Sequence, residues 1–163
     1  VARIRFYNFE ENLHKNQLVV HKQGNDARMM TQIIIPSDCG NAPKKNFLKD
    51  FYTAWAKDDL DFCKKHLDDH IIWEIVGQNT LSGIENFEKQ LQHYPIRNAS
   101  KMVIETIITH GTDASVDGQI WTNEGAVFAF CDVYKFKGFK GFSLKSIKSF
   151  WVELPTGSGC RGN

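Results

Sequence analysis

The chain has 163 residues, which is enough to bury a core and close to the usual size of one domain. Its 20 basic and 19 acidic side chains leave a net charge of +1, so nothing indicates binding to nucleic acid or to an anionic membrane surface. No run approaches the roughly 20 apolar residues that a membrane-spanning helix needs. We therefore expect a soluble, cytoplasmic protein with no nucleic-acid and no membrane partner.

The cysteines and histidines are scattered along the chain. Cys39, Cys63, Cys131 and Cys160 lie far apart without a CxxC pair, and the six histidines form no HxH pair; only His66 and His70 have an HxxxH spacing. We expect reduced thiols, no metal site and no cofactor.

Composition divides the chain into three parts. Residues 1–29 mix aromatic and polar side chains without a sustained period, so this segment is interpreted as an N-terminal extension of unclear role. The main domain is expected at 30–154. Glycine and polar residues over 155–163 are typical of a flexible C-terminal tail.

Three helices are predicted in the first part of the domain. A cap and a proline at 41–43 begin the first helix, which ends at 57–58. Asp59 can cap a second, short helix, and Gly83 precedes a third. The apolar stripes are, in turn, Phe47, Leu48, Phe51 and Trp55; Leu60, Cys63 and Leu67; and Ile84, Phe87 and Leu91.

Strand patterns occupy most of the remaining domain. One β-type run covers 70–76, between the second and third helices. After the third helix, runs rich in β-branched and aromatic residues cover 101–110, 114–122, 126–136 and 142–154, with glycine-containing turns at 123–125 and 137–141. This order predicts an α+β fold, in which helices cover one face of an antiparallel sheet.

Asp132 lies in a row of aromatic residues. Because side chains alternate along a strand, Phe128, Phe130, Asp132, Tyr134 and Phe136 share one face. A carboxylate on a buried apolar face must be paired, hydrogen-bonded or protonated, and burial raises its pKa. The alternatives are that this face points to solvent, or that Asp132 accepts a hydrogen bond from a backbone N–H.

Glu74 is a second carboxylate inside an apolar run. It shares a face with His70, Ile72 and Val76, whereas Ile71, Trp73 and Ile75 make up the other face. Burial could move the pKa of Glu74 toward neutrality and make it a general base. An ion pair with Lys145 or Lys148 on a neighbouring strand is the structural alternative.

The ordered set of motifs over 43–154 resembles ketosteroid-isomerase-like and SnoaL-like proteins of the nuclear transport factor 2-like superfamily. The shared pattern is an aromatic helix, a short acidic turn, a second helix, the double aspartate at 68–69 and a strand that ends in Gly77. Segments 81–87 and 131–136 are similar to the family's third-helix start and to its strand before the final hairpin. The resemblance implies a cone-shaped, curved sheet, three N-terminal helices over it, and an apolar pocket.

The resemblance also implies roles for single residues. Glu74 takes the position of the isomerases' general base, and Asp132 that of the acid that stays protonated and stabilises an enolate. Phe51 stands where those enzymes have a tyrosine, so the oxyanion hole is incomplete unless Tyr52 approaches through a rotation of the helix by one position.

These observations predict a small-molecule pocket protein. The leading hypothesis is an isomerase, cyclase or hydrolase that uses Glu74 and Asp132 for acid–base chemistry on a hydrophobic or carbonyl-containing substrate. The alternatives are a non-catalytic ligand-binding module and a dimeric interaction module that uses the sheet face with Lys145, Ile147, Ser149 and Trp151. Candidate ligand contacts are Tyr52, Trp55, His70, Trp121, Phe130, Tyr134 and Lys148, although aromatic residues at such positions are more often plain core.

Overall fold

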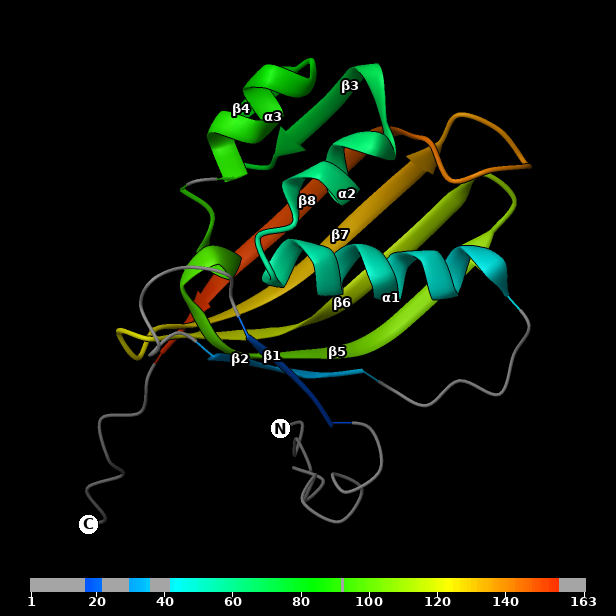
Figure 1. The fold of residues 1–163 in the computed structure, drawn as a ribbon. Helices are drawn as coiled ribbons and strands as arrows, with labels where there is room; N and C mark the ends of the chain where they lie inside the picture. Colours follow the sequence, from blue (N-terminus) through cyan, green and yellow to red (C-terminus); the bar gives the residue numbers. More distant parts are fainter. Residues whose placement is uncertain (1–16, 22–29, 36–41, 92, 156–163) are drawn as a thin grey trace, which may run out of the picture.

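The computed structural model describes residues 17–21, 30–35, 42–91 and 93–155. In this part of the chain, three α-helices and one 3-10 helix accompany a single curved sheet of eight strands (Figure 1). The helices are α1 Pro43–Ala56, α2 Leu60–Lys65, α3 Ile84–Leu91 and the 3-10 helix η2 Pro95–Asn98. The strands are β1 Gln17–His21, β2 Met30–Ile34, β3 Leu67–Ile75, β4 Asn79–Ser82, β5 Ala99–His110, β6 Asp113–Thr122, β7 Val127–Phe136 and β8 Leu144–Leu154.

The strand order across the sheet is β1-β2-β5-β6-β7-β8-β3-β4. Strands β5 to β8 form the expected antiparallel meander. The expectation of an entirely antiparallel sheet is wrong, because β3 pairs with β8 in parallel and β2 pairs with β5 in parallel. In each of these two pairs the strands are far apart in the sequence, so no short turn forces them to run in opposite directions.

Local signals set the ends of the first two helices. Pro43 lies in the first turn of α1, where a missing backbone N–H costs nothing. The chain leaves α1 through Asp58, which has a positive φ of 64°. The Asp59 side chain then accepts a hydrogen bond from the Phe62 backbone N–H at 3.0 Å, which confirms it as the cap of α2.

Helix α1 supplies much of the buried surface. It crosses the concave face of the sheet in front of β6 and β7 (Figure 1). Phe47, Leu48, Phe51, Tyr52 and Trp55 are all buried, so this helix presents its full aromatic stripe to the inner face of the sheet. The core of the protein therefore lies between α1 and the inner sides of the strands.

The α+β class with three helices on a curved sheet is confirmed. Three strands were not anticipated: β1 lies inside the segment interpreted as an extension, β2 at the start of the expected main domain pairs with it, and β4 forms a hairpin with β3. Residues 1–16, 22–29 and 156–163, which include the rest of that segment and nearly all of the expected tail, lie outside the described residues. No helix of the described part is both long and apolar enough to cross a membrane.

Gly118 marks the bend of the sheet. The register between β5 and β6 shifts between Ile104 and Thr106, directly opposite Gly118. A Cβ atom on Gly118 would collide with the backbone carbonyl group of Val103. Only a residue without a side chain lets β5 pass this close to β6, so glycine is required for the bulge that curves the sheet.

Replacing Gly118 with alanine should therefore destabilise the fold. We expect Gly118→Ala to lower the free energy of unfolding by about 2 kcal/mol or more, because backbone rather than a flexible side chain must move. Gly138→Ala is the matched control, since its new methyl group would meet no atom closer than 3.8 Å. Urea unfolding of both variants checks this, and an equal effect of the two substitutions would contradict it.

Candidate functional site

Asp132 is at the centre of the inner face of the sheet. It lies on β7 between Phe130 and Tyr134, and its side chain is completely buried, at 0% exposure. All three side chains point toward α1 because residues two apart on a strand share a face. Of the predicted aromatic row, Phe130, Tyr134 and Phe136 are therefore confirmed as part of the core, whereas Phe128 is half-buried.

Two tyrosine hydroxyl groups hold one oxygen of the carboxylate. Tyr52 on α1 donates a hydrogen bond of 2.5 Å to Asp132 Oδ2. Tyr134 donates to the Tyr52 hydroxyl at 2.8 Å and lies 3.5 Å from the same carboxylate oxygen. Since the 2.8 Å contact has the more favourable length, the three groups form a relay that runs from Tyr134 through Tyr52 to Asp132.

Burial dominates the electrostatics of these groups. Loss of hydration raises the pKa of Asp132 to about 6, and the hydroxyl groups of Ser149 and Tyr52, the Trp151 indole and the Tyr134 hydroxyl oppose the rise. Burial, followed by the charge of Asp132, also raises the pKa of the Tyr52 and Tyr134 hydroxyls well above the usual value. Both tyrosines thus stay protonated donors, while Asp132 can change its protonation state near neutral pH.

Four buried polar atoms in this part of the core lack a hydrogen-bond partner among the described residues. They are Asp132 Oδ1, Tyr94 Oη, Trp55 Nε1 and Trp151 Nε1. Although the Ser149 hydroxyl and the Trp151 indole lower the pKa of Asp132, neither group meets Asp132 Oδ1 in normal hydrogen-bond geometry. An unsatisfied buried donor or acceptor costs about 1–3 kcal/mol, so four such atoms in one part of the core mark it as the candidate site.

The side chains that carry these atoms form one continuous aromatic cluster. The ring centroid of Tyr94 lies 4.5 Å from that of Trp151 and 5.5 Å from that of Trp55. Trp151 also stacks on Phe130, with 5.3 Å between the ring centroids. Burial and the nearby charge of Asp132 raise the pKa of Tyr94. The inner polar cluster is the name used below for these four aromatic residues together with the relay: Trp55, Tyr94, Phe130, Trp151, Tyr52, Tyr134 and Asp132.

Five of the predicted site residues belong to the inner polar cluster: Tyr52, Trp55, Phe130, Asp132 and Tyr134. Tyr52, which was considered from the sequence as the donor in place of a tyrosine at position 51, brings its hydroxyl group to the carboxylate.

Glu74 and Lys148 lie on the outer face of the sheet, away from Asp132. Lys148 Nζ is 3.1 Å from Glu74 Oε2, and the two side chains are 46% and 42% exposed. This ion pair was the structural alternative for Glu74. The hypothesis that Glu74 and Asp132 line one pocket is therefore wrong in this structure.

The register of β3 explains this placement. Glu74 is opposite Lys148 on β8, whereas the next residue, Ile75, is opposite the buried Ser149. Ser149 in turn is opposite Asp132 on β7. Because successive side chains alternate between faces, Glu74 must point away from Asp132.

His70 and Trp121 also lie outside the inner polar cluster. His70 is exposed at the start of the outer face of β3. Trp121 is half-buried on β6, where Lys101 Nζ sits 4.7 Å from its ring centroid. Neither residue is brought to Asp132.

The face chosen for β8 was also wrong. Ile147 and Ser149 are buried and Trp151 is half-buried on the inner side, so these three residues do not form an exposed patch with Lys145. The outer side of β8 carries Lys148, together with two exposed apolar residues described below.

Tyr94 was not identified as a site residue from the sequence. Nor did the sequence establish that the side chains of Trp73 and Ser149 point to the inner face of the sheet. The Trp73 indole N–H donates to the Ser149 hydroxyl at 2.8 Å, next to Asp132. The uniformly apolar set Ile71, Trp73 and Ile75 was a usable signal for the buried face of β3. Tyr94 precedes η2 in an irregular segment without a period, so no sequence pattern pointed to it.

The described residues offer no ready metal site. No three His, Cys, Asp or Glu side chains among them are close enough to hold a metal ion. Cys63 is buried, and loss of hydration raises the pKa of its thiol to about 12, so it remains a protonated core residue.

Comparison with known proteins places this geometry in context. A sequence model of the SnoaL-like domain matches residues 48–140. No protein of curated function gives a significant match. An NTF2-like protein of unknown function from Burkholderia xenovorans has a similar structure, with a TM-score of 0.59 and 16% identity over 71% of this chain and 87% of the other.

Two further solved structures carry names that describe an activity. One is an LEH-like epoxide hydrolase from M. tuberculosis, with a TM-score of 0.54 and 15% identity over 66% of this chain and 80% of the other. The other is a proposed SnoaL-like polyketide cyclase from Shewanella denitrificans, with a TM-score of 0.56 and 12% identity over 68% and 92% of the two chains. At these identities the likeness establishes the fold.

The raised pKa of Asp132 predicts a specific dependence of stability on pH. The folded state binds this proton more tightly than the unfolded state, so stability from Asp132 is complete below pH 4 and declines as pH rises toward 6. We expect the wild type to lose roughly 2 kcal/mol relative to Asp132→Asn between pH 4 and pH 7. Urea unfolding of both proteins across this range measures it. A constant difference between them would contradict the raised pKa.

Proposed function

Because this chain belongs to the SnoaL-like domain family, we propose that it binds a small, mainly apolar molecule with a carbonyl or hydroxyl group, and that Asp132 exchanges a proton with it. The single observation that carries this proposal is the inner polar cluster. It contains a buried carboxylate with one free oxygen, surrounded by aromatic rings and by three donors without partners among the described residues.

The chemistry of the cluster supports a proton transfer. A group with a pKa of about 6 can both accept and donate a proton near neutral pH, which is what a general acid–base group must do. The relay of Tyr52 and Tyr134 fixes Oδ2, so Oδ1 is the oxygen left to meet a ligand. The N–H groups of Trp55 and Trp151 can stabilise negative charge on a ligand oxygen.

Among the reactions considered, a single carboxylate favours a proton transfer next to a carbonyl group. In an isomerisation or a cyclisation next to a carbonyl group, the same group can take a proton from one atom and return it to another. Since Glu74 is held by Lys148 on the outer face, this mechanism assigns it no role. The alternative is a binding module in which Asp132 only orients the ligand, and turnover that is lost in Asp132→Asn distinguishes the enzyme from it.

Binding can be tested through the indole signals of the four tryptophans, with β-naphthol as an apolar probe that carries a hydroxyl group. We expect β-naphthol to shift the indole N–H signals of Trp55 and Trp151, because these groups lack partners among the described residues. The signal of Trp121 on the outer face should stay in place. Two-dimensional nitrogen–proton NMR spectra, assigned with single Trp→Phe variants, measure the shifts.

Two controls make this test specific. Asp132→Asn should weaken β-naphthol binding about tenfold or more, the effect of one lost charged hydrogen bond, while Glu74→Gln should leave it unchanged. Naphthalene lacks the hydroxyl group and should bind more weakly than β-naphthol. Equal binding by both carboxamide variants, or shifts confined to Trp121, would refute the proposed ligand site.

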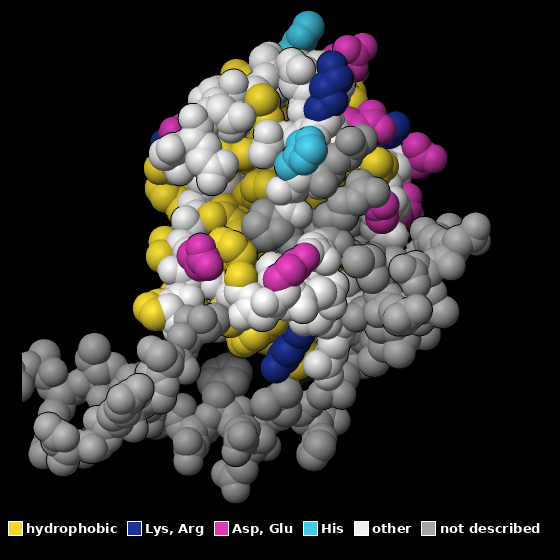
Figure 2. All heavy atoms as spheres, turned by 90° about the vertical axis from the view of Figure 1, so that its left-hand side faces the viewer, with side chains coloured by type: hydrophobic (Ala, Val, Ile, Leu, Met, Phe, Trp, Pro, Cys, Tyr) yellow, Lys and Arg dark blue, Asp and Glu magenta, His cyan; other side chains and the backbone are white. Residues whose placement is uncertain are grey.

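We also propose that the outer face of the sheet pairs two copies of the chain. Ile72, Val133, Phe150 and Val152 are exposed by 47%, 39%, 41% and 61% on the adjacent strands β3, β7 and β8. Several hydrophobic side chains likewise reach the surface in Figure 2, which views the molecule from the side of α3. Adjacent exposed apolar residues of this kind mark interaction sites.

A charge in this face should prevent the pairing. We expect wild-type protein to have the mass of a dimer in light scattering after size-exclusion chromatography, and Phe150→Glu to have the mass of a monomer. Phe139→Glu is the matched control, because Phe139 is 80% exposed in the loop between β7 and β8. A monomeric wild type, or equal effects of both substitutions, would exclude this face as the dimer interface.

A further inference from the structure

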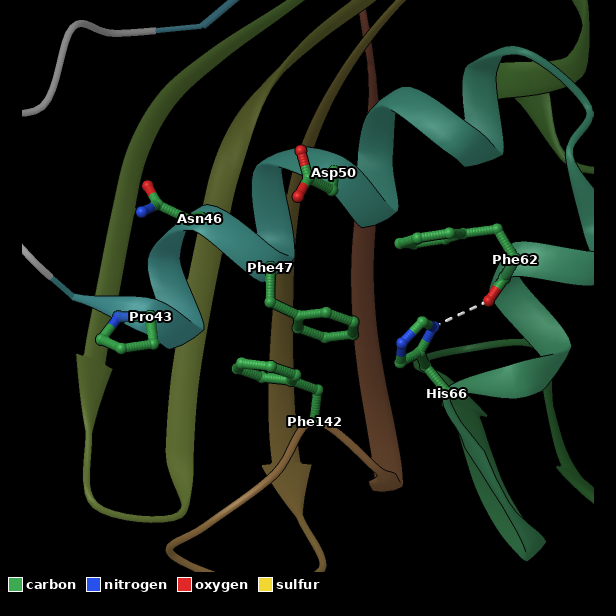
Figure 3. A pocket seen from close by; sticks show the side chains of 7 residues that line it. All are labelled: Pro43, Asn46, Phe47, Asp50, Phe62, His66 and Phe142. Carbon is green, nitrogen blue, oxygen red and sulfur yellow. Dashed lines mark hydrogen bonds between the residues drawn. The ribbon is translucent and has the colours of Figure 1, made fainter.

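A pocket of about 500 Å³ opens at the other end of α1 from Trp55. Its wall comes from the first turns of α1, from α2 with the residue that follows it, and from the loop between β7 and β8 (Figure 3). None of its lining residues belongs to the inner polar cluster, so the two sites are separate in composition.

Aromatic rings make up most of this pocket. Phe47 and Phe142 stack with a centroid distance of 5.1 Å and an interplanar angle of 12°. The His66 ring lies 5.0 Å from that of Phe47 and 4.6 Å from that of Phe62. Phe142, which is 37% exposed, forms one end of this short aromatic row, whereas Phe47 is only 5% exposed. Such rings attract organic cations through their negative faces.

Two polar groups supply the pocket with hydrogen-bond acceptors. His66 Nδ1 lies 2.9 Å from the Phe62 carbonyl oxygen, and since a carbonyl only accepts, Nδ1 must carry the hydrogen (Figure 3). In the neutral ring, Nε2 is then left as an acceptor. The Asp50 side chain adds a carboxylate to the lining, and no ion pair or hydrogen bond to that carboxylate is found in the described part of the chain.

A neighbouring pocket provides an internal contrast. It measures about 450 Å³ and shares Pro43 and Phe142 with the first, but Lys44 and Lys140 line it and no acid does. The first pocket contains Asp50 and neither Lys nor Arg. The two adjoining depressions therefore differ in the sign of their charge.

We propose that the pocket between α1, α2 and the β7–β8 loop binds a small organic ammonium ion that carries an aromatic or aliphatic group. The ammonium group is held by Asp50 and His66, and its apolar part packs on Phe47, Phe62 and Phe142. This site is independent of the proposed chemistry at Asp132.

Protonated phenethylamine is a suitable probe, because it joins a phenyl ring to an ammonium group. We expect millimolar binding that shifts the backbone amide signals of Phe62, His66 and Phe142 in NMR spectra of the full chain. High salt should weaken it, because the charged partner is exposed. Hydrocinnamate, which has the same ring on a carboxylate, should not shift these signals.

Two variants connect the binding to the pocket. Asp50→Asn should weaken phenethylamine binding by about threefold to tenfold, the range expected for one exposed charge and its cation–π contacts. Asp61→Asn removes a carboxylate that is 97% exposed on α2 and is not part of the lining, so it should leave the affinity unchanged. Hydrocinnamate binding as tight as that of phenethylamine, equal effects of the two variants, or no shifts at Phe62, His66 and Phe142 would each overturn the proposal.

Discussion

The hydrogen bond between Tyr52 and Asp132 is the interaction on which the rest of the structure depends. It joins α1 to β7 across the core and holds a carboxylate in surroundings that are otherwise mainly apolar. Tyr134 extends it, and Ser149 and the Trp73 indole complete the polar layer beside it. A buried carboxylate is costly unless its hydrogen bonds are made, so the position of α1 over the sheet is linked to the position of this charge.

The curvature of the sheet and the difference between its two faces follow from the same layout. The bulge opposite Gly118 bends β5 and β6 around α1, so that inner side chains of β7 and β8 converge on one aromatic cluster. The outer residues of these strands face solvent. Glu74 and Lys148 pair on that outer side, which separates the two carboxylates that a two-acid mechanism would need together. A proton transfer through Asp132 alone is the chemistry that this arrangement supports.

The helices and most of the strands were predictable from the sequence, whereas the sheet face to which several side chains point was not. Proline at 43, the cap at Asp59 and the glycine turns are local signals, so the helices and the four-strand meander could be located from them. Alternation correctly separated Ile71, Trp73 and Ile75 from Glu74, and the uniformly apolar composition of the first set was a usable signal for the buried face. The position of Glu74 relative to Asp132 depends on the parallel pairing of β3 with β8, a contact between distant segments that leaves no mark in either strand. Tyr94 lies in an irregular segment and enters the site only through tertiary packing.

The most direct test is an NMR titration of the Asp132 carboxyl carbon, in the wild type and in Tyr52→Phe. A pKa of about 6 is expected in the wild type, and a higher pKa in the variant, because the Tyr52 hydroxyl stabilises the ionised form. This result would establish Asp132 as a buried group that exchanges its proton near neutral pH. A pKa close to that of an exposed aspartate, unchanged by the loss of the Tyr52 hydroxyl, would contradict the account of both the core and the proposed function.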